Sequence, residues 1–430
     1  MIITQNYASV TLEKTEQNVQ GNMGLSWTFQ SMKHFGLEKI INNKFPKKKS
    51  NSEIPAWNKI MSASLMLIAG GDRVEDIEKL RADNSLINSL GWKSMISPDT
   101  LLNFTAEKRT AARLRQSIEE QVVLAMQRDK TDEYTYDNDA TYADSEKDCA
   151  TYSYKERKQV SGLLGFIPEL CGLCITSDFR PGNISPATGI LNQLRKAAKW
   201  AKKAGKKIAR FRSDSAAHNQ KIWKYCEKEG IKYFISLDQN KVIKESVKGI
   251  AEFHWQKLEG TDKEWAEFSY MPIVTKKNKG VMVRALALRW RKANPDLFDN
   301  YHYHVIGTND WDIAPFEWLE FHNGRMGSEK YNSELKSGLN GKYTPSNDFN
   351  ICRGYFMLTV LAYNVLQIMK LFYLDKEAES WTVKRIRYWF IETVGKFVIS
   401  GRKVKCKLIN CCDLTWKLFV SCQRRLILNW

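Results

Sequence analysis

Apolar residues in the first third of the chain recur at helical spacing. After residue 54, short apolar runs follow a period of three to four, as at Ile60, Leu65 and Ile68. Glycines interrupt these runs, and Pro98 followed by Asp-Thr is typical of a helix start. The pattern predicts a helical N-terminal region over residues 1–127, whose short helices fit either a helix-turn-helix or an ordinary helical bundle.

The first 50 residues of this region are polar and end in a basic cluster, Lys47 to Lys49. They are interpreted as a mobile lead-in to the helices.

The periodicity changes to that of β-strands near residue 133. Segments rich in Tyr and Thr at 134–143 and 149–155, and a third segment at 169–179, predict three strands. A basic amphipathic helix at 188–207, a strand at 208–216, a helix through Tyr225 and a strand at 233–237 follow. This order predicts an α/β fold with a ribonuclease-H-like core.

Four further strand-like segments, FHWQKL, EWAEFSYMPIV, VMVRALALRW and YHYHVIGT, interrupt this core. They predict a β-rich insertion at 245–308, which divides the predicted ribonuclease-H-like core into 128–244 and 309–375. The apolar run at 355–374 is long enough for a membrane span, but Asn, Gln and Lys interrupt it, and we expect a buried helix. Residues 376–430 form a basic C-terminal region.

The charge balance indicates a polyanionic partner. Lys and Arg number 66 against 48 Asp and Glu, which gives a net charge of +18. Such an excess favours nucleic acid, because neutralised phosphates release their counterions. The nine cysteines are odd in number and follow no secretory signal, so we expect a reduced, cytoplasmic setting without a disulfide framework. Cys171 and Cys174 have CxxC spacing, but zinc binding is not favoured, because positions three apart in an apparent strand face opposite sides and no second pair lies at zinc-ribbon spacing. The C-terminal cysteines follow no familiar zinc pattern.

Two aspartates are candidates for metal-dependent chemistry. Asp139 lies on a strand and shares one face with Asp137 and Thr141, so the pattern alone does not separate the two aspartates. Asp214 ends a strand just before a predicted helix, where α/β folds place functional groups. Phosphoryl transfer on DNA requires carboxylates that converge from separate elements on two metal ions.

A third candidate lies in HNGRMGSEKYNSELK. On one helix, His322, Arg325, Glu329 and Lys336 share a stripe, whereas Glu334 faces elsewhere. Glu329 would bind the metal, and Arg325 and Lys336 the phosphates. The spacing is equally that of an i,i+4 ion pair between Arg325 and Glu329.

These motifs together resemble the DDE transposases of bacterial insertion sequences. Their third carboxylate lies in a Tyr-Arg-Glu-Lys signature with gaps of two, three and six residues, and here histidine replaces the tyrosine at position 322. Asp139-Ala-Thr and Arg-Ser-Asp214-Ser fit the first and second aspartates of this family. The phrases YHVIGTND, HNGR and YF…LAYN resemble the insertion-sequence group numbered thirteen-eighty.

The resemblance implies a transposase that cuts DNA at the element's ends and transfers the 3′-OH strands into target DNA. Asp139, Asp214 and Glu329 would hold Mg²⁺, for which Mn²⁺ can substitute, with His322, Arg325 and Lys336 as signature support. It also implies that the N-terminal region binds DNA, that the partner is double-stranded DNA, and that a homodimer forms the synaptic complex. The enzyme would act in the bacterial cytoplasm at the nucleoid, with no membrane partner. The alternatives are a catalytically idle DNA-binding descendant and a hydrolytic nuclease of the same fold.

Other signals have a functional and a structural interpretation. His302 and His304 share a strand face and could bind metal, but a core or surface role is favoured. The tryptophans of the insertion and of the segment after it could stack on unpaired bases or pack in the core. The basic helix at 188–207 could contact the DNA backbone or present a solvated face.

Overall fold

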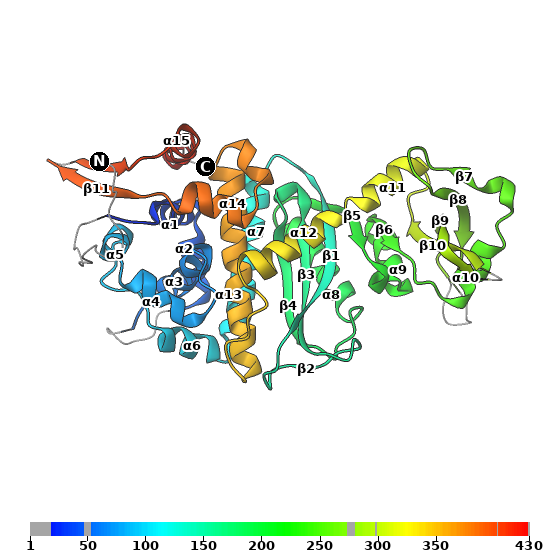
Figure 1. Ribbon diagram of the computed structural model, residues 1–430, viewed down its shortest axis with the longest axis horizontal. Helices are drawn as coiled ribbons and strands as arrows, with labels where there is room; N and C mark the ends of the chain where they lie inside the picture. Colours follow the sequence, from blue (N-terminus) through cyan, green and yellow to red (C-terminus); the bar gives the residue numbers. More distant parts are fainter. Residues whose placement is uncertain (1–18, 47–52, 273–279, 297–298, 402, 429–430) are drawn as a thin grey trace, which may run out of the picture.

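The computed structural model of the protein describes residues 19–46, 53–272, 280–296, 299–401 and 403–428. Figure 1 shows an elongated molecule, with the N-terminal helices at one end, the β-rich insertion at the other, and β1 and α12 between them. The basic cluster at Lys47 to Lys49 lies outside the described residues.

Helices make up the N-terminal part of the chain, as the apolar spacing predicts. They are α1 (Met23–Phe35), α2 (Leu37–Lys44), α3 (Ala56–Ile68), α4 (Ile77–Arg81), α5 (Asn84–Leu90), α6 (Pro98–Ala106) and α7 (Thr110–Arg128). The interpretation of the first 50 residues as a mobile lead-in is wrong for α1 and α2. Leu25, Phe29 and Met32 lie on one face of α1 and are fully buried, so this segment is part of the core.

The central sheet has the element order predicted from the sequence. Three strands, a helix, a strand, a helix and a strand follow in turn: β1 (Glu133–Asp144), β3 (Lys158–Ile167), β4 (Leu173–Pro181), α8 (Ile190–Lys203), β5 (Lys207–Ser213), α9 (Gln220–Glu229) and β6 (Lys232–Ser236). The strands lie in the order β4-β3-β1-β5-β6. β1, β3 and β4 are antiparallel neighbours, whereas β1, β5 and β6 run parallel. The mixed α/β fold is thereby confirmed.

The second strand of the sheet was predicted in the wrong place. The segment 149–155 forms only the short β2 (Thr151–Tyr152), where Tyr152 is 71% exposed, and the full strand is β3. Two glycines in β3 weaken its sequence signal, but they allow close packing. A Cβ at Gly165 would lie 2.2 Å from the Tyr136 hydroxyl, and one at Gly162 would lie 2.9 Å from the Phe356 ring.

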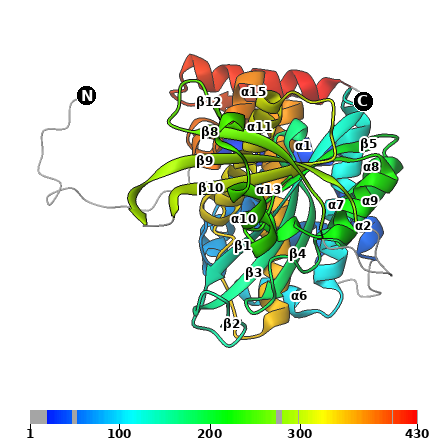
Figure 2. The same cartoon turned by 90° about the vertical axis from the view of Figure 1, so that its right-hand side faces the viewer.

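The insertion contains the four predicted strands and extends the same sheet. After α10 (Lys241–Lys248) come β7 (Gln256–Lys257), β8 (Glu264–Tyr270), β9 (Val283–Asp296) and β10 (Asp299–Thr308). β10 pairs antiparallel with β6, from Ile306 opposite Ser236 to Thr308 opposite Phe234. Figure 2 shows β9 and β10 projecting beyond the body of the molecule.

A long apolar helix, α13 (Phe349–Ile368), lies in the centre of the molecule. It follows α11 (Pro315–Asn323), α12 (Met326–Ser333) and a π-helical turn at Glu334–Gly338. α13 packs against α3, α6, α7 and β4. Among the described residues, the helical segment Phe349–Tyr373 is the one stretch with the length and hydropathy of a membrane span, and 94% of its most apolar window is buried inside the protein. The prediction of a buried helix is confirmed.

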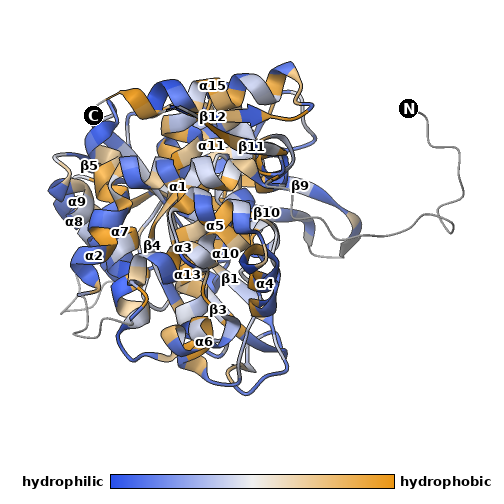
Figure 3. Ribbon diagram, turned by 90° about the vertical axis from the view of Figure 1, so that its left-hand side faces the viewer, coloured by the Kyte–Doolittle hydropathy of each residue, from blue (hydrophilic) through white to orange (hydrophobic). Residues whose placement is uncertain are grey.

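The C-terminal segments return to the N-terminal helices. They comprise α14 (Val383–Ile386), the two-stranded hairpin β11 (Gly395–Ser400) and β12 (Lys403–Leu408), and α15 (Asp413–Ile427). α15 packs on α1, and Gln20 pairs with Gly395 through two backbone hydrogen bonds of 2.9 and 3.0 Å. Figure 3 looks at this end of the molecule, where α15, β11 and β12 lie next to α1.

Candidate active site

The parallel ladder between β1 and β5 brings two aspartates to one edge of the sheet. Asn138 and Ser213 form the last pair of this ladder, and Asp139 and Asp214 are the next residues of the two strands. Asp214 begins a 3₁₀ turn, and its Oδ1 accepts a hydrogen bond of 3.0 Å from the backbone N–H of Ala216. The two carboxylates therefore come from neighbouring strands, as a shared cation site requires.

The two carboxylates also interact electrostatically. Burial and the negative charge of Asp214 together raise the pKa of Asp139 to about 6, although Arg325 and a hydrogen bond from Asn332 oppose the change. A carboxylate whose ionised form is disfavoured by burial and by a second carboxylate is stabilised by a cation between them. The donor set thus fits a divalent metal ion.

Asn332 fixes the orientation of Asp139. Its Nδ2 donates a hydrogen bond of 2.7 Å to Oδ2 of Asp139, and its side-chain Oδ1 is buried without a hydrogen-bond partner. Sequence reasoning missed this residue. Asn332 lies three positions after Glu329 in α12, so the helical stripe through Glu329 and Lys336 contained the signal that could have found it.

A buried ion pair distinguishes Asp137 from Asp139. Asp137 is fully buried and accepts two hydrogen bonds from Arg212, at 2.7 and 2.8 Å. Burial raises the pKa of Asp137 to about 6, although Arg212 opposes this change. Arg212 already satisfies the Asp137 carboxylate, so Asp139 is the better candidate for a metal ligand.

The signature residues do not lie on one continuous helix, which corrects the sequence prediction. α11 ends at Asn323 and α12 begins at Met326. Arg212 explains the break, because its Nη1 donates a hydrogen bond of 2.8 Å to the backbone oxygen of Phe321. The guanidinium lies so close to Gly324 that a Cβ there would be 2.3 Å from Nη1.

Glu329 lies apart from the two aspartates. Its Oε1 accepts a hydrogen bond of 3.0 Å from Arg325, and the Glu329 side chain is 58% exposed. The i,i+4 ion pair that the spacing allowed is therefore present. Among the residues that the structure describes, no three His, Cys, Asp or Glu side chains gather closely enough to hold a metal ion.

Glu334 points away from Asp139. Its Oε2 accepts a hydrogen bond of 2.5 Å from the backbone N–H of Val383, at the start of α14. This is the different face predicted for Glu334, and the π-helical turn that begins at Glu334 carries its side chain there.

The two remaining signature residues have different environments. His322 is buried, and its Nε2 lies 3.2 Å from the Ser236 hydroxyl. Burial, together with His304 and nearby arginines, lowers the pKa of His322 to about 3, so its ring is neutral and offers no positive charge to a phosphate. Lys336 donates a hydrogen bond of 2.7 Å to the backbone oxygen of Tyr142, and burial lowers its pKa.

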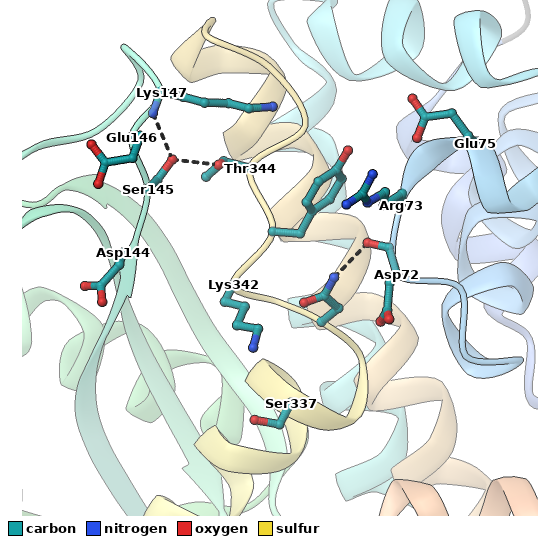
Figure 4. Close-up of a pocket in the computed structure, with 12 residues that line it drawn as sticks. Asp72, Arg73, Glu75, Asp144, Ser145, Glu146, Lys147, Ser337, Lys342 and Thr344 are labelled. Carbon is teal, nitrogen blue, oxygen red and sulfur yellow. Dashed lines mark hydrogen bonds between the residues drawn. The ribbon is translucent and has the colours of Figure 1, made fainter.

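A large open cavity of about 870 Å³ lies beyond Lys336, between β1 and the N-terminal helices (Figure 4). Asn340 donates a hydrogen bond of 2.7 Å to the backbone oxygen of Asp72 across it, and the hydroxyls of Ser145 and Thr344 lie 2.8 Å apart. The carboxylates Asp72, Glu75, Asp144 and Glu146 and the cations Arg73, Lys147 and Lys342 line it. Because acidic and basic groups alternate, it does not present a uniform basic surface to DNA.

Two weaker sequence signals look different in the structure. Cys171 does not lie in a strand as expected: it adopts a left-handed φ of 52° before β4 begins. The basic residues of α8 have acidic neighbours in α7. Lys203 lies 3.7 Å from Glu120, and Lys196 and Lys199 lower the pKa of Glu119 against the effect of its burial. These pairings favour the solvated interpretation of the basic helix.

Comparison with known proteins gives a family match along almost the whole chain. Residues 3–427 match the family described as Transposase DDE domain group 1. Among solved structures, the chain is similar to a piggyBac transposase synaptic complex with hairpin DNA, with 11% sequence identity, a TM-score of 0.44, and coverage of 94% of this chain and 82% of that chain. No curated protein sequence matches it.

Proposed function

Since this chain belongs to the transposase family of DDE domain group 1, we propose that it cuts DNA at the ends of an insertion sequence and joins those ends to target DNA. The observation that supports the proposal most is that Asp139 and Asp214 come directly after the last residue pair of the parallel ladder between β1 and β5. The phrases YHVIGTND and HNGR favour the insertion-sequence group numbered thirteen-eighty.

Each residue of the site has a role in this proposal. Asp139 and Asp214 hold Mg²⁺, or Mn²⁺ in its place, and Glu329 completes the ligand set. When Arg325 binds a DNA phosphate, it releases Glu329 from their ion pair, so that the side chain can turn toward the two aspartates. Lys336 lies next to β1 and supports a second phosphate.

The bound cations supply charge neutralisation for in-line phosphoryl transfer. Water attacks the phosphodiester at the element's end, the P–O3′ bond breaks, and a 3′-OH remains. That 3′-OH attacks a phosphodiester of the target strand, and a target 3′-OH leaves. The protein holds both phosphodiesters in line with their nucleophiles through Arg325 and Lys336.

Cleavage of DNA that carries the parent element's end tests the proposal. Wild type and Glu329→Gln are compared with Mg²⁺ and with EDTA. We expect nicking at the element's end by wild type with Mg²⁺, and none with EDTA or in the variant. Hydrolysis without any strand joining to a supplied target would instead identify a nuclease of this fold.

One observation favours a second candidate, a DNA-binding descendant without catalysis. Glu329 is held by Arg325, and the described residues contain no assembled three-ligand site. In that case wild type would bind end DNA and cut none of it, even when two ends are supplied together.

Because transposition joins two ends, we also propose a homodimer in the synaptic complex. Light scattering of the protein with end DNA tests this stoichiometry.

A further inference from the structure

The hairpin of β11 and β12 has one basic face and one apolar face. Lys396 pairs with Lys407, Val398 with Lys405, and Ser400 with Lys403. Because side chains alternate across a strand, these pairs share one face, which therefore carries four lysines. Phe397, Cys406, Ile399 and Val404 pair on the other face.

Among the residues that the structure describes, the positive charges on this face have no acidic partner. No Asp or Glu occurs between Thr393 and Cys412 in the sequence, and within the described part of the chain no carboxylate forms an ion pair with any of the four lysines. Lys396 and Lys407 lie directly opposite each other, an arrangement that destabilises a β-ladder. A polyanion bound to this face would remove the repulsion.

The helices cover the apolar face only in part. Phe397, Ile399 and Val404 line a cavity of about 550 Å³ together with Trp27 of α1 and Leu426 of α15, and Lys396 lines the same cavity. Ile399 and Val404 remain 78% and 66% exposed. Cys406 interacts with the side chain of Trp27 as well. Lys403, Lys405 and Lys407 do not line this cavity, and all three are exposed, so their ammonium groups are accessible to a partner.

We propose that the β11–β12 hairpin is a DNA-binding arm, which lays its lysine face along the phosphate backbone of double-stranded DNA. A two-stranded ribbon fits the major groove of B-form DNA, and lysines at alternate positions suit the phosphates along it. Figure 1 places β11 at one end of the molecule, while β1 and α12 lie near its centre. The arm thus holds DNA away from the bond that is cut. This inference rests on the proposed function for the identity of the polyanion.

The test compares two variants that each lose four positive charges. The arm variant replaces Lys396, Lys403, Lys405 and Lys407 with Gln, and the control replaces Lys196, Lys199, Lys202 and Lys203 of α8 with Gln. Binding to a fluorescent duplex is measured by polarisation in EDTA across a salt series. We expect the arm variant to lose affinity by about tenfold or more, with a log–log salt slope shallower by roughly 0.9 per lost phosphate contact. Equal losses in the two variants would overturn the inference, because net charge alone would then explain them.

Folding and partner identity are checked separately. Thermal unfolding should show no loss of stability in the arm variant, because it removes repulsion between exposed lysines. If that variant fails to fold, the wild-type protein is acetylated with and without duplex DNA. Mass spectrometry then measures whether DNA protects the four lysines. Unchanged acetylation would overturn the inference. Binding to vesicles of phosphatidylserine and phosphatidylcholine tests the alternative partner, a membrane surface. Loss of vesicle binding with unchanged DNA binding would mean that the arm serves a membrane and not DNA.

The two proposals can fail independently, since binding in EDTA needs no cleavage. Wild type that binds duplex through the arm but never cuts end DNA would overturn the proposed function alone. Wild type that cuts end DNA, with an arm variant that keeps the wild-type affinity and salt slope, would overturn the arm alone.

Discussion

Asn332 donates a hydrogen bond from Nδ2 to Oδ2 of Asp139 across 2.7 Å, and so joins α12 to β1 although 193 positions separate the two residues. The contact leaves Asn332 buried and its Oδ1 unpartnered. Asn332 is therefore a positioning residue that fixes the plane of the Asp139 carboxylate, in the manner of the hydrogen-bonded partners that orient metal ligands.

Removing the hydrogen-bond donor of Asn332 should raise the Mg²⁺ concentration that cleavage requires. We expect Asn332→Ala to need about 10- to 100-fold more Mg²⁺ for half-maximal cleavage, the usual effect of losing such a partner. Asn332→Gln keeps an amide and should recover part of the loss. Cleavage against Mg²⁺ concentration measures the effect. A lower maximal rate at unchanged Mg²⁺ dependence would show that Asn332 supports only the fold.

Neutralising the two paired aspartates should remove cleavage. Asp139→Asn and Asp214→Asn each delete one charge of the proposed metal site, and we expect a loss of about a thousandfold, or several kcal/mol of transition-state stabilisation. DNA binding in EDTA should remain. Glu334→Gln is the matched control, because Glu334 contacts Val383 and faces away from Asp139. Retained cleavage in Asp214→Asn would remove Asp214 from the site.

Gly324 should not tolerate a side chain. A Cβ there would lie 2.3 Å from Nη1 of Arg212, whose guanidinium is held by Asp137 and cannot easily move away. We expect Gly324→Ala to destabilise the protein by about 1–3 kcal/mol. Gly327→Ala is the control, since its nearest neighbour would be 3.8 Å away and alanine favours the helix. Urea unfolding compares the two variants; equal stabilities would contradict the close approach of Arg212.

His322 should make the protein sensitive to acid. Its pKa falls from 6.5 to about 3 on folding, so below pH 6.5 the unfolded chain binds a proton that the native ring does not. The contribution of His322 to the free energy of unfolding is therefore fully present above pH 6.5 and is lost as the pH falls toward 3. At pH 5 the loss is as much as about 2 kcal/mol.

His322→Gln should remove this part of the pH dependence. Urea unfolding at pH 7.5 and pH 5 measures it, and His302→Gln, at an exposed position, serves as the control. His304 also has a lowered pKa, so some acid sensitivity should remain in the variant. If the variant showed the same difference in the free energy of unfolding between pH 7.5 and pH 5 as wild type, protonation of the His322 ring in the unfolded chain would not be its cause.

Local signals predicted the parts of the site that depend on one strand or one turn. Asp214 could be proposed because it follows a recognisable strand pattern, whereas Asp139 was separated from Asp137 only by the family resemblance; the order of the elements could be read from the change of period. The partners of Asn332 and Arg212 could not be predicted from the sequence, since they lie 193 and 75 positions away, although Asn332 shares the helical stripe with Glu329 and Arg212 lies in the motif of Asp214. The break at Gly324 was missed for the same reason, because Arg212 of a distant strand causes it.

The misplaced second strand shows a different limit. The segment around Tyr152 has the composition of a strand but lies exposed, whereas β3 contains glycines that a propensity scale counts against it. These glycines are required by side chains that pack onto β3, namely Tyr136 and Phe356. Packing across the sheet therefore outweighed the local preference of the chain.

The junction of β10 with β6 consists of three residue pairs, Ile306–Thr308 against Phe234–Ser236. β6 in turn pairs with β5, the strand that ends just before Asp214. Two backbone ladders thus connect the insertion to the strand that carries a candidate metal ligand at its end. Any rotation of the insertion relative to the core would have to twist these three pairs, so the geometry of the candidate site and the orientation of the insertion are mechanically linked.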